Sequence, residues 1–305
     1  MIAEWAIELK ALDRNETGRR RLRLPGWVRR TLHRPHGAFG LAVVILVLGA
    51  ALTSLFWTPY PLLFTSDLYW AAPSWQHVLG TDQIGRDTFS WLMAGARTTV
   101  VVVIGATAMA GVIGLGLGAL SASLAPKLAE PLVVLVDIGV AFPVLLIAML
   151  LATGFGGSIW VVILAVGFGA GLNLARVIRS EIVRVDASDY ILAARASGTG
   201  ALARLWQHVL PNVAPVVVVQ LSVTAGVAIL AEAGLTFLGY GAAPAEASWG
   251  RVLADAQKYI GVAPASVIWP GIAIGITVLA LNLTGDAIGE ALDPRLIREV
   301  NRHGA

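Results

Sequence analysis

The chain has 305 residues, of which 57% are hydrophobic and 13% are charged. Soluble domains carry about 25% charged residues, so this composition excludes an ordinary soluble domain and indicates an integral membrane protein. The chain has no cysteine, which excludes disulfides, thiolate metal sites and a thiol nucleophile. The net charge of +3 says little as a total, but the positions of the charges are informative.

Residues 1–37 form a polar segment that carries nine lysines and arginines. A cleaved signal peptide is not expected, because the apolar run that follows is long and lacks a small-residue cleavage site before Trp57. A basic cluster can bind nucleic acid, but beside a membrane span it more often sets orientation and contacts anionic headgroups. We therefore expect contact with membrane lipids and no nucleic-acid partner.

Six apolar stretches follow, and each has a length suited to a membrane-spanning helix, which takes about 20 residues. They predict an all-α, polytopic membrane protein with a six-helix domain at residues 38–288 and a tail at 289–305. The stretches are 38–57, 98–120, 132–152, 159–175, 213–238 and 267–288.

The distribution of basic residues predicts the orientation. If the N-terminus lies in the cytoplasm, the inner segments hold eighteen lysines and arginines and the outer segments hold four. Short cytoplasmic loops are enriched in these residues. We therefore expect a multi-pass protein of the cell membrane with both termini in the cytoplasm.

The first outer loop contains the run HVLGTDQIGRD at residues 77–87. The run has two glycine turns and three charges. It lacks the ligand spacing and the terminal glutamate of a calcium loop, which excludes that kind of site. Its notable residues are Gly80, Thr81, Asp82, Gly85, Arg86 and Asp87.

Four residues interrupt the apolar stretches: Asp137, Pro143, Glu232 and Asp286. Charged side chains in hydrocarbon are costly and usually face a bundle interior or a cavity. Proton relays use such acids, but these three acids have no matching base or histidine in the spans. We therefore expect them to serve in helix packing or gating, and Pro143 to kink its span.

The longest polar interruption spans residues 181–212. Residues 191–196 suit a helix because Leu, Ala and Arg lose little freedom there. Gly198 and Gly200 turn the chain, and residues 202–210 can form a second short helix before Pro211 begins a new segment. A helical pair at a membrane surface can dock a soluble partner. The local pattern leaves an ordinary connector loop open as the alternative.

This segment resembles the EAA loop of the membrane subunits of bacterial ABC importers, with Leu192 standing where the general motif has glutamate. The pattern Asp-Tyr, Ala-Ala-Arg-Ala, Gly and His-x-Leu-Pro-Asn is similar to that of the dipeptide and oligopeptide branch. In that family the loop is a coupling helix that sits in a cleft of the ATPase subunit. The residues that carry the resemblance are Asp189, Tyr190, Ala193, Ala194, Arg195, Gly198, His208, Leu210 and Pro211.

Other segments resemble the same family. Residues 79–87 match the Leu-Gly-Thr-Asp-x-x-Gly-Arg-Asp signature of one of the two permeases in peptide and nickel importers. Asp137 with residues 141–143, then residues 248–251 and 292–295, are also similar to it. The resemblance therefore extends over residues 32–295.

The resemblance implies one half of a translocation pathway that works by alternating access. It implies a second, homologous permease, two ATPase subunits, an extracytoplasmic substrate-binding protein, and peptides as substrate, with nickel as an alternative. ATP and Mg²⁺ would lie on the ATPase subunits, because this chain has no Gly-x-x-x-x-Gly-Lys-Ser/Thr loop. We expect no cofactor, no metal site and no catalytic residues in the chain itself. A secondary, ion-coupled transporter and a non-transporting scaffold or receptor are the alternatives.

Overall fold

The computed structural model describes residues 26–243 and 245–292. In this part of the chain the secondary structure is helical, apart from an isolated bridge between Thr81 and Asp87. The expected all-α fold is confirmed. The basic residues at positions 1–25 and the tail at 293–305 lie outside the described residues.

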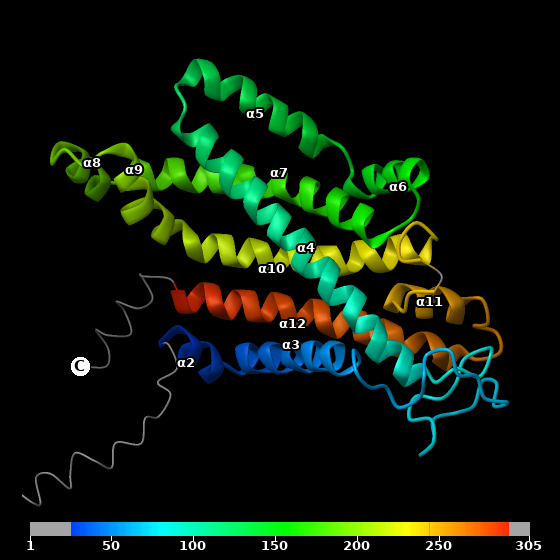
Figure 1. Cartoon of the computed structure of the whole chain (residues 1–305). Helices are drawn as coiled ribbons and strands as arrows, with labels where there is room; N and C mark the ends of the chain where they lie inside the picture. Colours follow the sequence, from blue (N-terminus) through cyan, green and yellow to red (C-terminus); the bar gives the residue numbers. More distant parts are fainter. Residues whose placement is uncertain (1–25, 244, 293–305) are drawn as a thin grey trace, which may run out of the picture.

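Five helices in the described part are long and apolar enough to cross a membrane. Figure 1 shows four of them running side by side, with α4 crossing them obliquely. They are α3 (Pro35–Thr53), α4 (Thr88–Ser123), α7 (Ile159–Asp186), α10 (Leu210–Phe237) and α12 (Ile268–Leu292).

The third expected span is a broken helix. It consists of α5 (Pro126–Ala141) and α6 (Val144–Phe155), which meet at a bend of 76°. Phe142 lies at the break with extended backbone angles. The ring of Pro143 disfavours a helical conformation for the residue before it, so the helix ends there. The six expected spans are thus five continuous helices and one broken pair.

Two expected boundaries were wrong. The second span begins at Thr88 rather than at residue 98, because the Asp87 carboxylate caps the helix by accepting from the Ser90 amide. The fourth span continues past residue 175 to Asp186, so residues 181–186 belong to α7 rather than to a loop. The first extension ends at Arg97, a charged residue that interrupts the apolar run, and the second carries several charged residues.

The second short helix expected at residues 202–210 is not a separate element. Helix α9 (Ala201–Arg204) continues through a π-helical turn, η1 (Leu205–Val209), directly into α10. Pro211 lies in the first turn of α10, where its missing N–H and fixed φ are tolerated. The segment of residues 181–212, here called the coupling segment after the family loop that it resembles, therefore joins α10 without a break on its C-terminal side.

The core lies where α4, α7 and α10 pack together. Its fully buried side chains include Val102, Val162, Val166 and Ala228. A Cβ atom on Gly114 would lie 2.5 Å from Cγ of Leu174, so α4 and α7 approach more closely than larger residues allow. Helix α12 packs between α10 and α3. The sequence thus specifies a tight helical bundle around α7.

The two ends of the bundle carry different elements. The loop with residues 77–87 and α11 (Trp249–Gln257), which is followed by η2 (Pro264–Val267), lie at one end. Helices α8 (Asp189–Ala196) and α9 lie at the other end, as does α2 (Gly26–His33) (Figure 1). There Arg30 donates to the Ala291 carbonyl, and Arg34 pairs with Glu290. The two sequence features that carry the family resemblance are therefore on opposite sides of the membrane domain.

Candidate functional site

Helix α8 is anchored on the end of the bundle by one apolar side chain. Ile191 is fully buried and belongs to a cluster with Ile182 and Val185 of α7 and with Val209 of η1. The neighbouring α8 residues on either side are exposed. Ile191 thus fixes which face of α8 turns toward the membrane domain and which faces out.

A carboxylate at the end of α7 ties the coupling segment together. Asp186, the last residue of α7, accepts from the guanidinium of Arg195 on α8. Its other oxygen lies 3.2 Å from Nε of Arg204 on α9. Gly198 turns the chain between the two helices with φ of +83°. One acidic side chain therefore fixes α8 and α9 relative to α7.

Sequence reasoning missed Asp186 and Arg204. A signal was present, because an aspartate in the last turn of a helix faces the negative end of the helix dipole and needs a cation nearby. Arg195 was expected to take part in docking. In the structure its guanidinium pairs with Asp186, and 43% of its side chain remains exposed.

The outward surface of α8 is a mixture of small and large apolar residues. Tyr190 and Leu192 are 48% and 49% exposed, and Asp189 and Ala193 are also exposed, whereas Ala194 is half-buried. On η1, Trp206 is 65% exposed. Large apolar side chains exposed at the polar end of a membrane domain are typical of a protein-docking surface.

Three residues of the resemblance lie outside this surface. His208 is half-buried in the π-helical turn, where its backbone carbonyl accepts a hydrogen bond from the side-chain amide of Asn212. Leu210 and Pro211 begin α10. These residues connect the coupling segment to the membrane span.

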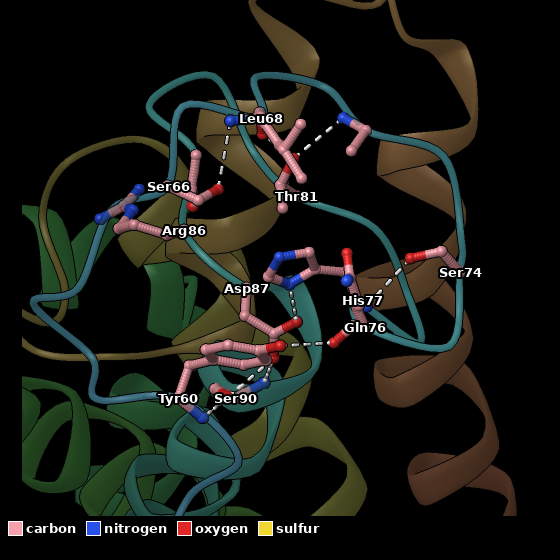
Figure 2. A network of polar contacts seen from close by, with 12 residues as sticks. Tyr60, Ser66, Leu68, Ser74, Gln76, His77, Thr81, Arg86, Asp87 and Ser90 are labelled. Atoms are coloured by element: carbon pink, nitrogen blue, oxygen red, sulfur yellow. Dashed lines mark hydrogen bonds and ion pairs between the residues drawn. The ribbon is translucent and has the colours of Figure 1, made fainter.

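The signature in the first outer loop folds around a buried aspartate (Figure 2). The Asp87 carboxylate accepts from the amide and the hydroxyl of Ser90 at 2.8 and 2.7 Å. Its other oxygen lies 2.9 Å from Nδ1 of His77, whose ring stacks on Tyr60. Asp87 and His77 are both buried. Asp87 therefore begins α4 and holds the loop on top of it.

The remaining signature residues close the loop on itself. Gly80 and Gly85 have φ of +78° and +79°, and a Cβ atom on Gly85 would lie 1.9 Å from the Ser66 carbonyl oxygen. Thr81 donates to the Leu68 carbonyl and accepts from the Ala71 amide (Figure 2). The Asp82 carboxylate accepts from Nε of Arg86 at 2.5 Å. The signature thus specifies a rigid loop.

Arg86 also connects this loop to residues 239–266, here called the second outer segment. Its guanidinium lies 4.1 Å from the ring centroid of Trp91 and 3.8 Å from the Asp255 carboxylate on α11. Trp249, at the start of α11, donates to the Leu92 carbonyl of α4. The two outer segments are therefore braced on the same helix end.

Glu232 lies in the interior, next to the outer end of α10. It is fully buried, and its Oε1 accepts from Ser248 at 2.8 Å and from Thr236 at 2.9 Å. Ser248 caps α11 by accepting from the Arg251 amide. Glu232 thus links α10 to the second outer segment. These contacts fit a role of Glu232 in helix packing.

The expectation that the acids in the spans lack a basic partner was wrong for Asp137. Its carboxylate lies 3.3 Å from Nε of Arg176 on α7. The pair joins residues far apart in the sequence, so only the packing of α5 on α7 reveals it. Pro143 marks the break between α5 and α6, and Asp286 is exposed on α12.

Comparison with known families identifies the membrane domain. The family described as "Binding-protein-dependent transport system inner membrane component" matches residues 112–298. The chain belongs to this family. Residues 112–298 include the broken span, α7, the coupling segment, α10, α11 and α12. The predicted kinship with permease subunits of ABC importers is confirmed.

Individual relatives match over most of their length. A putative peptide permease protein of Brucella suis biovar 1 is 34% identical over 261 residues, which covers 84% of this chain and 86% of the relative. The nickel transport system permease protein NikC of Escherichia coli K12 is 33% identical over 262 residues, which covers 85% and 95%. The peptide and nickel branch inferred from residues 79–87 is confirmed.

A solved structure shares the fold. It is an inward-facing form of the MetNI methionine ABC transporter, with a TM-score of 0.56 and 19% sequence identity. The match covers 66% of this chain and 96% of that chain. At this identity the comparison supports the arrangement of helices alone.

Proposed function

We propose that the chain is a peptide permease subunit of an ATP-driven importer, and that α8 couples it to partner ATPase subunits. The observation that carries the proposal is the presentation of α8. Ile191 and Asp186 hold the helix on the end of α7, and its outward surface exposes small and apolar residues that no described part of the chain covers. A segment that served only as a connector would not need this anchoring.

The orientation follows from the charges. Basic residues gather at the α8 end of the bundle, and they belong to the segments that hold most of the basic residues of the chain: Arg30, Lys127, Arg184 and Arg195. This end is therefore cytoplasmic under the positive-inside rule. The signature loop and α11 then face outward, where a substrate-binding protein can dock.

The continuity of the helices supports a mechanical route from α8 to the spans. Helix α7 runs through 28 residues from the outer side to Asp186, and α10 continues without interruption from η1. A displacement of α8 acts on both helices, and α7 is packed closely on α4. For ATP to drive alternating access, the assembly must bind ATP more tightly in one of its two conformations.

The assembly contains more than this chain. ATP and Mg²⁺ are held by two partner ATPase subunits, and this chain binds neither and hydrolyses no ATP. A second, homologous permease completes the pathway, and an extracytoplasmic binding protein delivers the substrate. The peptide permease relatives support peptides as substrate, and the nickel relative marks the alternative.

Substitution of Ala194 by glutamate tests the coupling role. Ala194 is half-buried beside the exposed surface of α8, so Ala194→Glu adds bulk and an ionised group at the edge of the surface that would be buried against the ATPase. Mispairing of a buried charge at an interface costs about 2–5 kcal/mol. At about 1.4 kcal/mol per decade, the ATPase association weakens tenfold or more. Expression and membrane insertion remain normal because the spans are unchanged, whereas uptake is lost.

Ala125→Glu is the matched control. Ala125 is exposed at the start of α5, on the same side of the membrane and outside α8. The control should retain ATPase association and uptake. If Ala194→Glu and Gly198→Leu both keep full substrate-stimulated ATPase activity and uptake, residues 181–212 are a connector and the proposal fails.

A further inference from the structure

Helix α7 carries a polar stripe within its membrane-spanning part. Asn173, Arg176 and Ser180 are spaced by three and four residues, which places them on one face of the helix. Asn173, Arg176 and Ser180 are exposed, whereas the exposed residues Leu164 and Phe168 in the outer half of α7 are apolar. At 1.5 Å per residue, Arg176 lies about 26 Å along the helix from Ile159. That is within a hydrocarbon layer of about 30 Å.

Arg176 on this stripe forms an ion pair with Asp137 of α5, and both side chains are partly exposed. The side chains of Arg176 and Asp137 are 55% and 52% exposed. Charged groups inside a bilayer face a protein interior or water, because hydrocarbon cannot replace their hydration. The surface that carries this pair is therefore not a lipid-facing surface.

A groove continues this surface toward the membrane centre. Asn173 lines it together with Gln220 and Thr224 of α10, and Val144 of α6 closes one side. The groove has a volume of about 230 Å³, and a water molecule needs only about 10–15 Å³ of such space. The groove is thus large enough to hold several water molecules, and Asn173, Gln220 and Thr224 are the polar residues of a lining that is otherwise apolar.

The same surface lies at the break in the third span. Asp137 lies on α5, before the 76° bend, and Val144 begins α6 after it. The ion pair therefore attaches one half of the broken span to α7, and the groove borders the other half. A water-exposed polar surface thus coincides with the one bent span of the described residues.

We infer that Asp137, Asn173, Arg176, Gln220 and Thr224, here called the polar wall, line the aqueous pathway and contact solutes that carry both charge signs. The inference rests on the proposed transport function and names the residues and solute class. The half-exposed carboxylate of Asp137 and guanidinium of Arg176 are complementary in charge to the ammonium and carboxylate groups of a zwitterionic peptide. A bare divalent transition metal requires several nitrogen, sulfur or carboxylate ligands. Within residues 26–243 and 245–292, no three His, Cys, Asp or Glu side chains form a group that could hold one.

Cysteine labelling tests whether the polar wall is accessible to water. The chain has no cysteine, so single variants need no altered background. Asn173→Cys is compared with Leu279→Cys in inside-out vesicles that contain the complete native complex, using a charged methanethiosulfonate. Leu279 is 50% exposed on α12. Asn173 and Leu279 each lie about 20 Å from the inner end of their helix. We expect Asn173→Cys to react at least about tenfold faster, and equal rates overturn the inference.

Solute protection tests the solute class. A zwitterionic dipeptide, added with ATP and the binding protein, should slow labelling of Asn173→Cys several-fold, whereas Ni²⁺ should not. Arg176→Gln should abolish this protection while leaving the labelling rate without solute unchanged. Protection by Ni²⁺ alone, or no protection by the dipeptide, overturns the assignment to zwitterions. If the wall fails these tests while the unmodified complex still shows ATP-driven uptake, the proposed transport function stands. If that uptake is absent, the transport function itself fails.

Discussion

Removal of the Asp186 carboxylate should loosen the coupling segment without affecting the spans. Asp186 pairs with Arg195 and Arg204, and the Arg204 side chain is only 18% exposed. Exposed ion pairs contribute about 0.2–1 kcal/mol each, so the two together contribute about 0.4–2 kcal/mol, with the Arg204 pair at the upper end. Asp186→Ala should therefore reduce the fraction of chains with α8 correctly positioned by about 2–30-fold.

The measurement is the concentration of purified ATPase subunit that half-saturates binding to the permease in detergent or nanodiscs. We expect this concentration to rise by about the same factor, and hydrogen exchange in α8 to become faster. Arg184→Ala is the control, because Arg184 lies on the same helix end and its ion pair with Glu181 is formed within α7 itself. Unchanged ATPase binding and unchanged exchange in Asp186→Ala would show that Asp186 does not position α8.

Three further outcomes are expected. Gly85→Ala should destabilise the outer loop, because the added methyl group meets the Ser66 carbonyl and the residue has a φ of +79°. We expect proteases to cleave the loop of this variant faster, and cleavage at the rate of the native protein would contradict this. Glu232→Ala should destabilise the folded chain by about 2–4 kcal/mol in denaturant titrations, since two buried hydroxyl groups lose their acceptor. A smaller loss from Glu232→Gln, which keeps one acceptor oxygen, should accompany it. Ser197→Cys should resist an impermeant thiol reagent added to intact cells, whereas Trp75→Cys should react, and the reverse pattern would refute the orientation.

The fold class was predictable because its signals are local. Long apolar runs specify spanning helices, and the run at residues 79–87 and the segment 181–212 carry the family resemblance. The break in the third span was only partly visible. Pro143 indicated a kink, but the apolar run continues on both sides of it, and hydrophobicity does not report the backbone conformation of Phe142.

The candidate site was less predictable because its contacts are long-range. Asp137 and Arg176 are far apart in sequence, so no local pattern indicates that they pair. Asp186 acts through two arginines that follow it across a turn, and its role depends on how α8 folds back. The early start of α4 could have been predicted from Asp87 and Ser90, which form a helix-capping pattern before the less apolar first turns.

The central claim is that partner ATPases drive import through this chain. Its most direct test is peptide uptake into proteoliposomes that contain the complete complex, with the binding protein outside and ATP accessible to the ATPase subunits. We predict uptake that requires both ATP and the binding protein, and that is lost with Ala194→Glu while Ala125→Glu retains it. Uptake that proceeds without ATP and follows an imposed proton gradient would contradict the account and indicate a secondary transporter.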